Sequence, residues 1–423
     1  MAEKAEKAQK QKMTKAEISW ILYDVGNSAL VLLATSLIPI YFDALSPDES
    51  TLTAWSYAET VASLIIALLM PILGSIADMQ GMKKKFIIGF VGTGAVATVA
   101  MGIPENATAF LVIYVISSVA LNSSMVFYDA LLIDTTTDDR MDEISSQGYA
   151  WGYIGSCIPF IVCLLIVLNY ETIGITFRTA MQISFVITAV WWVAFTIPLL
   201  KNVEQTHYKP REDHAISRAI KGLGKTIKEI WANKTIRYYM IAYFFYIDGV
   251  HTIIKLSTSY GTDLGIDSTQ LVLALLVTQI VAFPSAIIYG RLAQKFGTRR
   301  MLLIAIVAYF GIALFAAFFL ETAAEFWFLA IMVGLFQGGI QALSRSEFGK
   351  LCPKDRANEY FGFFDIFGKY AAVLGTFLVG IITDLTGNSS LGVLSIAILF
   401  VVGFCIMLKV PETSTEEVSS EEA

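Results

Sequence analysis

The sequence has few charged residues for a chain of 423. Only 16% are Asp, Glu, Lys or Arg, against about 25% in a typical soluble domain. Hydrophobic residues make up 56% of the chain. The formal net charge of −6 excludes little, because the position of each charge matters more than the sum in a membrane protein. The composition therefore argues against a water-soluble domain, predicts no nucleic-acid partner and indicates a protein surrounded by membrane lipids.

Residues that bind metals or carry out hydrolysis are also scarce. The chain has four cysteines and three histidines, and the cysteines lack metal-ligand spacing. We interpret the cysteines as packing residues, since three of them lie in apolar segments. The sequence contains no Walker loop for ATP, no zinc motif and no convincing Ser–His–Asp set. These absences predict a protein that is not an enzyme and has no metal site or cofactor.

Long apolar runs are the main feature of the sequence. A bilayer core roughly 30 Å thick needs about 20 mostly apolar residues in a spanning helix. Backbone amides cannot go unpaired in lipid, so these runs must be helical. The first run begins near Ile18, and no signal-peptide cleavage site follows it. We therefore predict an all-α polytopic membrane protein with twelve transmembrane helices, at residues 18–43, 53–77, 85–104, 108–133, 145–169, 179–201, 236–261, 269–293, 299–320, 325–346, 358–383 and 391–410.

The basic residues predict how these spans are oriented. Lys and Arg accumulate in the cytoplasmic loops of membrane proteins. With the N-terminus inside, all but three of the 30 Lys and Arg residues fall on the cytoplasmic side. The exceptions are Arg178 on the outside and Lys255 and Lys369 within spans. We therefore expect a multi-pass protein of the cell membrane with both termini in the cytoplasm.

The longest predicted loop divides the spans six and six. Its segment ISRAIKGLGKTIKEIW places Ile216, Ile220 and Trp231 at helical spacing, with basic residues elsewhere. This pattern is typical of a helix lying on an anionic membrane surface, although a linker helix packed on protein fits it as well. The predicted organisation is a basic tail at 1–17, a six-helix bundle at 18–201, the linker at 202–235, a second bundle at 236–410 and a disordered acidic tail at 411–423.

The two halves echo each other. GSIADMQGMKKK after the second span resembles GRLAQKFGTRRM after the eighth, and Gly74 and Gly290 in these stretches are 216 residues apart. Gly148 and Gly362 are separated by a similar distance. This pattern predicts a duplicated six-helix unit, and such repeats place the substrate site near the midplane between the halves.

Two sets of motifs carry a resemblance to a known family. Gly74, Asp78 and Gly81, followed by three lysines, resemble the signature loop of the major facilitator superfamily, whereas the second copy has Gln294 in place of the acid. The stretches WILYDVGNSA, DGVHTI, GGIQALSRSEF and YFGFFDIFGK resemble its vacuole effluxer-like branch. The resemblance implies the major facilitator fold, with two pseudo-symmetric six-helix bundles. It also implies transport, and the fungal relatives resemble exporters of amino acids.

Ionisable side chains inside predicted spans are candidates for binding solute or ion, because a charge at a helix centre costs roughly 2.5–3.5 kcal/mol. Asp248, His251 and Lys255 recur at helical spacing with Thr252 and Ser259, so we expect one polar face toward a cavity. An internal ion pair that fixes packing is the alternative. His251, Asp24 and Asp248 are candidate proton carriers. The other candidates are Tyr23, Asn27, Glu59 and the pair Asp365 and Lys369, which fits a structural bridge equally well.

Charges near the predicted cytoplasmic mouth are candidate gate residues. Such pairs would close the inner mouth while the outer one is open, and the Asp78 carboxylate is expected at the N-terminus of a neighbouring helix. Ordinary solvated loop charge is the competing interpretation. The candidates are Asp78, Lys83, Asp129, Asp134, Arg140 and Arg345.

The sequence as a whole predicts a secondary active transporter that works by alternating access as a monomer. Acids and bases both occur within the spans, so each end of a small zwitterion such as an amino acid would find an opposite charge. A proton or sodium gradient would drive transport, since no ATP site is present. The alternative is a non-transporting membrane sensor or a lipid scramblase-like scaffold.

Overall fold

The computed structural model describes residues 12–46, 51–211, 214–263 and 265–411. The side chains of residues 51–53, 258–259, 263, 268–269 and 369–373 lie outside the description. Regular structure in the described ranges is helical, apart from one isolated bridge between Met79 and Lys209. The all-α prediction is therefore confirmed.

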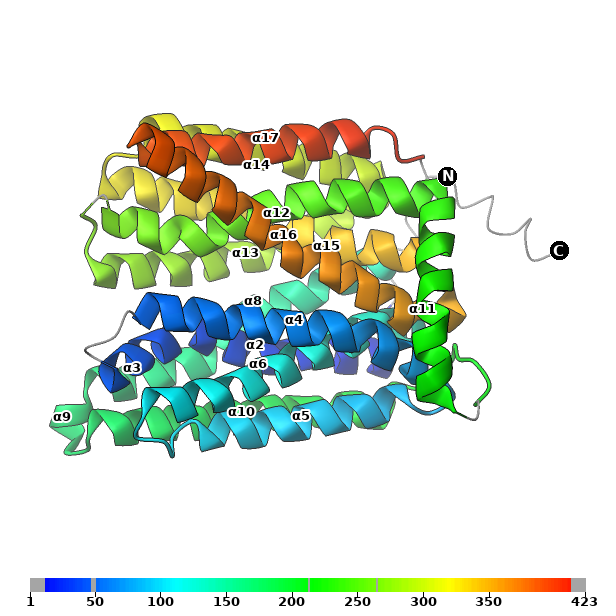
Figure 1. The fold of residues 1–423 in the computed structure, drawn as a ribbon, viewed down its shortest axis with the longest axis horizontal. Coiled ribbons are helices and arrows are strands. Elements are labelled where there is room, and N and C mark those ends of the chain that lie inside the picture. Colours follow the sequence, from blue (N-terminus) through cyan, green and yellow to red (C-terminus); the bar gives the residue numbers. More distant parts are fainter. Residues whose placement is uncertain (1–11, 47–50, 212–213, 264, 412–423) are drawn as a thin grey trace.

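Two groups of long helices lie side by side, one from each half of the sequence (Figure 1). We call them the N-half and the C-half. The N-half contains α2 (Lys15–Thr35), α3 (Leu37–Leu45), α4 (Thr51–Ala77), α5 (Lys83–Ala100), α6 (Ala107–Ala130), α8 (Met141–Leu168) and α10 (Phe177–Asn202), with the short α7 (Leu132–Thr135) and α9 (Tyr170–Ile173). The C-half contains α12 (Lys234–Asp263), α13 (Ser268–Phe296), α14 (Thr298–Phe319), α15 (Ala323–Leu351), α16 (Ala357–Thr386) and α17 (Ser389–Met407).

Nine helices in the described part of the chain are long and apolar enough to cross a membrane. The other three long helices, α5, α12 and α16, run alongside them (Figure 1). Each contains charged residues, such as the three lysines that begin α5 and Asp248 in α12. Nine of the twelve predicted spans thus contain a helix of spanning length and hydropathy, and the other three contain α5, α12 and α16.

The first predicted span, 18–43, is wrong as a single helix. The structure breaks it at Ser36, between α2 and α3. Pro39 explains the break, because its ring clashes with the carbonyl four residues earlier, which belongs to Thr35. At its other end α2 starts with a capping box, in which Thr14 and Glu17 satisfy each other's backbone N–H groups.

The linker forms α11 (Ala215–Ala232), which runs across one end of the molecule, nearly perpendicular to the long helices (Figure 1). We call this the linker end and the opposite one the far end. One face of α11 packs on protein through Ala219, Thr226 and Ile230. A neighbouring face leaves large apolar side chains exposed, and its lysines lie on the remaining side. The exposed apolar residues are Ile216, Ile220, Ile227 and Trp231.

Glycines allow the two halves to approach each other closely. A Cβ at Gly74 in α4 would lie 2.5 Å from the Asn358 carbonyl oxygen of α16. A Cβ at Gly290 in α13 would lie 2.7 Å from the Ser146 Cβ of α8. Gly74 and Gly290 occupy equivalent positions in the two copies of the repeat. Each lies against a helix of the opposite half. The duplicated motif thus provides a glycine for a close helix–helix contact between the halves in each copy.

Candidate functional site

Arg345 of α15 reaches across from the C-half into the N-half. Its Nη1 lies 2.8 Å from the Asp129 carboxylate and 3.6 Å from that of Asp24. Its Nε donates to the Ser145 hydroxyl and its Nη2 to the Ser145 carbonyl, both at 2.9 Å. The Arg345 side chain is only 3% exposed, so these partners compensate for the loss of water around its charge.

Aromatic rings surround the same guanidinium. Its central carbon lies 4.6 Å from the Trp20 ring centroid, 5.4 Å from that of Tyr128 and 4.3 Å from that of Tyr149. Such cation–π contacts contribute up to about 2 kcal/mol each when water is excluded. Gly148 makes the approach possible, since a Cβ there would lie 3.1 Å from Arg345 Nη2. The three rings and two carboxylates come from α2, α6 and α8, so one arginine ties three helices of the N-half to the C-half.

The candidates on α2 belong to this cluster. Asp24 is buried and accepts from the Tyr128 hydroxyl at 3.1 Å and from the Asn27 amide at 3.4 Å. Tyr23 donates to the Ser124 hydroxyl at 2.7 Å and lies against Tyr128. Asp24 stays a candidate for binding solute or ion, and in this state it pairs with Arg345.

A second link between the halves was missed by the sequence analysis. The buried Asp142 carboxylate at the start of α8 accepts from the hydroxyls of Thr298 and Ser346 and pairs with Lys350 at 2.7 Å. Lys354 pairs with Asp138 at 3.1 Å. Asp142 resembled an ordinary helix-start acid, because none of its partners lies near it in sequence.

Asp78 forms the third link. Its carboxylate accepts from the backbone N–H groups of Asn358 and Glu359 at 2.8 and 3.0 Å, and from the Asn358 side chain. It therefore lies at the N-terminus of α16, as its sequence context suggested. Burial raises the Asp78 pKa to about 6, although the Lys83 charge and these hydrogen bonds act in the opposite direction.

The remaining gate candidates pair within the N-half. Lys83 lies 2.6 Å from Asp134, and Arg140 lies 3.1 Å from Glu17. Burial opposes ionisation of Asp134, but hydrogen bonds from His207 and the Lys83 charge outweigh it and lower the Asp134 pKa. These pairs hold the loops and the start of the linker to the N-half and do not cross between the halves in this state.

Asp248 lies buried between α12 and α16. Its Oδ1 accepts from the Gly375 backbone N–H at 2.9 Å and from the Thr252 hydroxyl at 3.2 Å, whereas its Oδ2 has no hydrogen-bond partner among the residues that the structure describes. Gly375 is required here, since a Cβ would lie 2.7 Å from Asp248 Oδ1. The expected cavity-facing position of Asp248 is therefore not found in this state, because Gly375 lets α16 close over it.

The neighbouring candidates on α12, His251 and Lys255, have environments that differ from that of Asp248. His251 Nδ1 lies 3.3 Å from the Gly368 carbonyl oxygen of α16, so this nitrogen carries the hydrogen. Lys255 is exposed, and the structure describes no ion pair between it and Asp248. The Ser259 side chain lies outside the described residues. The predicted polar face of α12 is thus split between a buried contact with α16 and an exposed amine.

The last candidates lie further along their helices. Glu59, partly buried on α4, accepts a hydrogen bond from the Tyr114 hydroxyl of α6. Asp365 is partly buried on α16. The Lys369 side chain lies outside the described residues, so the expected pair of Asp365 and Lys369 is not described. None of these residues joins the Arg345 cluster through a described hydrogen bond.

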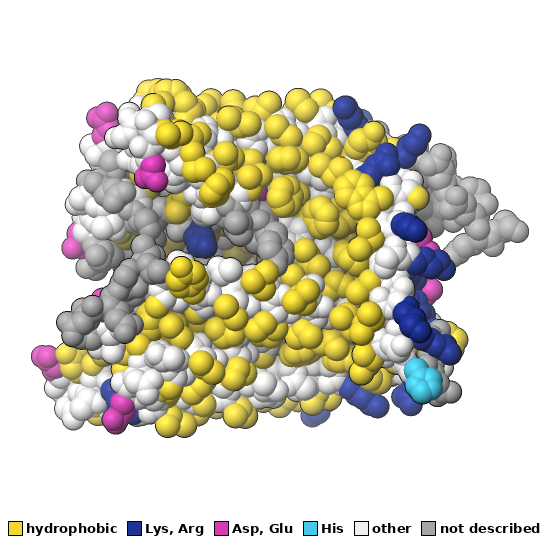
Figure 2. All heavy atoms as spheres, in the orientation of Figure 1, with side chains coloured by type: hydrophobic (Ala, Val, Ile, Leu, Met, Phe, Trp, Pro, Cys, Tyr) yellow, Lys and Arg dark blue, Asp and Glu magenta, His cyan; other side chains and the backbone are white. Residues whose placement is uncertain are grey.

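The described polar and ring contacts between the halves lie toward the linker end. On α8 they extend from Asp142 to Tyr153, which donates to Gln341 at 2.8 Å. On α4 they gather at Asp78, and the close approach of Gly74 lies one turn before it. Figure 2 shows the visible face hollowed between the halves toward the far end, with one Lys or Arg side chain in the hollow. Within the described part of the chain, the polar and ring contacts that join the halves are therefore concentrated toward the linker end.

Metal ligation does not explain these acids. Among the residues that the structure describes, no group of three or more His, Cys, Asp and Glu is placed to hold a metal ion. The arrangement can exchange protons at carboxylates and make or break ion pairs at the linker end.

Comparisons with known proteins identify the family of the chain. The family model of vacuole effluxer Atg22-like proteins matches residues 48–418. The chain is 44% identical over 422 residues to YxiO of Bacillus subtilis (strain 168), an uncharacterized MFS-type transporter, covering 97% of this chain and 98% of that one. It is 22% identical over 390 residues to Autophagy-related protein 22 of Kluyveromyces lactis, covering 83% and 78%.

Solved structures share the fold at low sequence identity. The proton:xylose symporter XylE has a TM-score of 0.73 at 12% identity, covering 96% of this chain and 97% of that chain. The transporter FucP in its outward conformation has a TM-score of 0.70 at 14% identity, covering 94% and 99%. Both are major facilitator transporters, so the predicted fold is confirmed. The chain therefore belongs to the vacuole effluxer Atg22-like family, within the major facilitator superfamily of transporters.

Proposed function

We propose that this protein is a proton-coupled secondary active transporter that moves a small polar solute of the amino-acid class by alternating access. It acts as a monomer in the cell membrane, with its linker end in the cytoplasm. The orientation is supported by the basic residues, which gather at the linker end in Figure 2, because such residues accumulate on the cytoplasmic side.

One observation carries the proposal: among the described residues, the polar contacts between the halves gather toward the linker end. Arg345, Lys350 and Asp78 each bind a partner on the opposite half there, near the ends of helices that diverge toward the far end. This pattern corresponds to an outward-facing state with a closed inner gate. Breaking these contacts while forming others at the far end would turn the same site toward the cytoplasm.

Asp248 is the proposed proton carrier. Asp248 is 0% exposed, and no described side chain places a cation beside it, so its anion would be costly and the neutral acid is favoured. Sodium is disfavoured, because it requires several oxygen ligands and the Asp248 neighbours include the Gly375 N–H, which only donates. Movement of α16 away from α12 would break the hydrogen bond from Gly375 to Asp248. Water would then reach Asp248, and its proton would be released.

The solute class is supported by the charges that remain available. Lys255 is an exposed amine within a span, and Asp24 and Asp129 lose their cation when Arg345 withdraws. A zwitterion fits this arrangement, since its carboxylate would meet Lys255 and its amine would meet the acids. The amino-acid class is also consistent with the vacuole effluxer description of the family.

Transport by purified protein in liposomes tests the proposal. We expect a panel of radiolabelled amino acids and other polar metabolites to reveal at least one solute whose movement follows an imposed pH gradient. Asp248→Asn should abolish movement driven by the pH gradient but keep exchange of solute for solute, because an amide stays neutral in both states. Thr383→Ala, elsewhere on α16, is the matched control and should transport like the parent protein.

Three results would contradict parts of the proposal. Absence of transport across the whole panel would favour the alternative of a sensor or scaffold. Dependence on sodium in place of protons, or gradient-driven transport that survives Asp248→Asn, would remove Asp248 as the proton carrier. A Lys255→Gln variant that transports normally would place the solute carboxylate elsewhere.

A further inference from the structure

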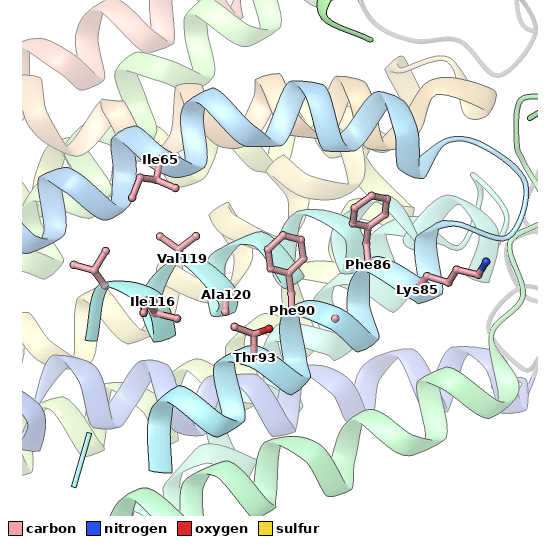
Figure 3. Close-up of a pocket in the computed structure, with 10 residues that line it drawn as sticks. Ile65, Lys85, Phe86, Phe90, Thr93, Ile116, Val119 and Ala120 are labelled. Carbon is pink, nitrogen blue, oxygen red and sulfur yellow. The ribbon is translucent and has the colours of Figure 1, made fainter. Parts of the chain in front are cut away.

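A groove on the outer surface of the N-half is separate from the site between the halves. It has a volume of about 430 Å³ and is formed by α4, α5 and α6. In Figure 3 the rings of Phe86 and Phe90 point from α5 toward α4, and Ile65 of α4 lies farther from the linker end, beside Val119. Val119 and Ala120 of α6 line its floor. The volume is within the range of small-ligand pockets, about 300–1,000 Å³.

The groove exists because of how three helices pack. α5 and α4 each pack extensively on α6, but they make little contact with each other. Gly89 widens the space on the α5 side, since a Cβ there would meet nothing within 4 Å. Several lining residues, such as Ile116, are exposed on the molecular surface. In a bilayer this opening faces hydrocarbon, so an acyl chain can enter sideways.

The linker end of the groove carries one positive charge. Lys85 is its only charged lining residue, and in Figure 3 its amine points away from the aromatic rings toward the linker end. Its two neighbours in sequence are already occupied. Lys83 pairs with Asp134, and Lys84 donates to the Leu200 carbonyl at 3.0 Å. The structure describes no acceptor for Lys85, which is exposed.

We propose that this groove binds an anionic phospholipid from the membrane leaflet at the linker end. One acyl chain lies between α4 and α5 against Phe86 and Phe90, and the phosphate pairs with the Lys85 amine. The lining of the groove matches the two parts of a lipid. Its apolar stretch suits an acyl chain, and Lys85 at its linker end lies at the depth where anionic headgroups lie. A bound lipid would hold α4 at its present distance from α5, and α4 carries the Gly74 and Asp78 contacts with the C-half.

The chain offers well-matched variants for a test. Lys85→Gln removes the charge, and Gly89→Leu adds an apolar side chain at a groove position where a Cβ meets nothing within 4 Å. Gly92→Leu is the control for the second change, because a Cβ at Gly92 also meets nothing within 4 Å and Gly92 does not line the groove. Lys228→Gln on α11 is the control for the loss of a surface charge.

Native mass spectrometry of the purified full chain would measure lipid retention. Phosphatidylglycerol and phosphatidylcholine with identical acyl chains are titrated in parallel, with inorganic phosphate as a separate probe in thermal unfolding. We expect phosphatidylglycerol to bind the parent protein more tightly, and Lys85→Gln to weaken it about fivefold. Gly89→Leu should abolish this binding, whereas both controls should retain it.

Each of the following results would overturn the proposal. Equal retention of both lipids, or parent-like binding by Lys85→Gln, would show that the headgroup is not recognised. Stabilisation by inorganic phosphate alone would indicate an anion site without a lipid. Parent-like binding by Gly89→Leu would place the lipid elsewhere, and if that variant does not fold, the comparison of Lys85→Gln with Lys228→Gln decides.

Discussion

Single residues show why the same charge can be structural in one state and functional in another. Arg345 makes ion pairs with two carboxylates and contacts three aromatic rings, all from the N-half. Its burial makes sense only if the linker end is closed, since opening would return both the arginine and the acids to water. Asp248 differs, because it is also buried but pairs with no cation among the described residues.

Replacing Arg345 by lysine should loosen the closed gate. Lysine keeps the charge, but it lacks the planar guanidinium that donates to Ser145 and Asp129 at the same time. It also cannot stack on the Trp20 ring. Each charge-assisted hydrogen bond lost costs about 1.5–3 kcal/mol. We expect faster alkylation of Cys352, which is buried where α15 ends, in a Cys405→Ser background. Arg178→Lys, at an exposed pair, is the control, and unchanged Cys352 reactivity would show that Arg345 does not hold the gate.

Asp78 should give the protein a pH-dependent stability. Its pKa is about 6 in the folded protein and near 3.9 in an unfolded chain, so the folded state binds more protons between these values. Stability from this group is therefore present at low pH, falls as the pH rises from about 4 to 6, and is constant above that, with a total change of roughly 2–3 kcal/mol.

Thermal unfolding of the parent protein and Asp78→Asn between pH 4.5 and 7.5 checks this dependence. The difference between the two melting curves should change below pH 6 and level off above it, because asparagine does not titrate. A difference that is independent of pH throughout the range would contradict the raised pKa.

At the level of elements, the repeat explains the contacts between the halves. α4 meets α16 at Gly74, and α13 meets α8 at Gly290, so two equivalent helix pairs form the crossing points. Small residues are common where membrane helices pack closely, because they let the backbones approach. The acid of the first copy caps α16, whereas Gln294 of the second reaches only Glu143 at 3.4 Å.

Adding a methyl group at Gly74 should disturb the closed state. Its Cβ would lie 2.5 Å from the Asn358 carbonyl oxygen, a backbone atom that cannot rotate away. Overpacking of this kind costs about 1–3 kcal/mol. We expect Gly74→Ala to lower the melting temperature and the transport rate. Gly311→Ala on α14, where a Cβ meets nothing within 4 Å, should leave both unchanged. If the two variants behave alike, the close approach is unimportant.

At the scale of the whole molecule, the two halves move against each other only if the linker-end contacts can open. A cross-link there should therefore stop transport. We expect a short, cleavable thiol reagent to inactivate the pair Asp138→Cys with Lys354→Cys, whose parent side chains lie 3.1 Å apart across the halves. Reduction should restore activity.

The matched control joins two residues of one half. Glu105→Cys with Arg178→Cys replaces an ion pair of 2.7 Å at the far end of the N-half. Cross-linking this pair should leave transport intact, because the N-half moves as one unit. Full activity of the cross-linked Asp138 and Lys354 pair would exclude opening at the linker end.

The sequence by itself determined the all-α membrane fold class and the family. Apolar runs of span length can only be helical in lipid, and the basic residues, the linker and the repeat are all visible along the chain. Local chemistry such as the position of Pro39 also predicts a break, although span length alone concealed it.

Only the tertiary structure decided which charges meet. Asp24 and Arg345 are far apart in sequence and were assigned to different roles, but they share one buried cluster. Asp142 and Lys350 went unnoticed, and Asp248 lies against Gly375 instead of near Lys255. The physical reason is that hydrophobic periodicity constrains each helix separately, whereas an ion pair depends on the rotation and offset of two helices that the pattern leaves free.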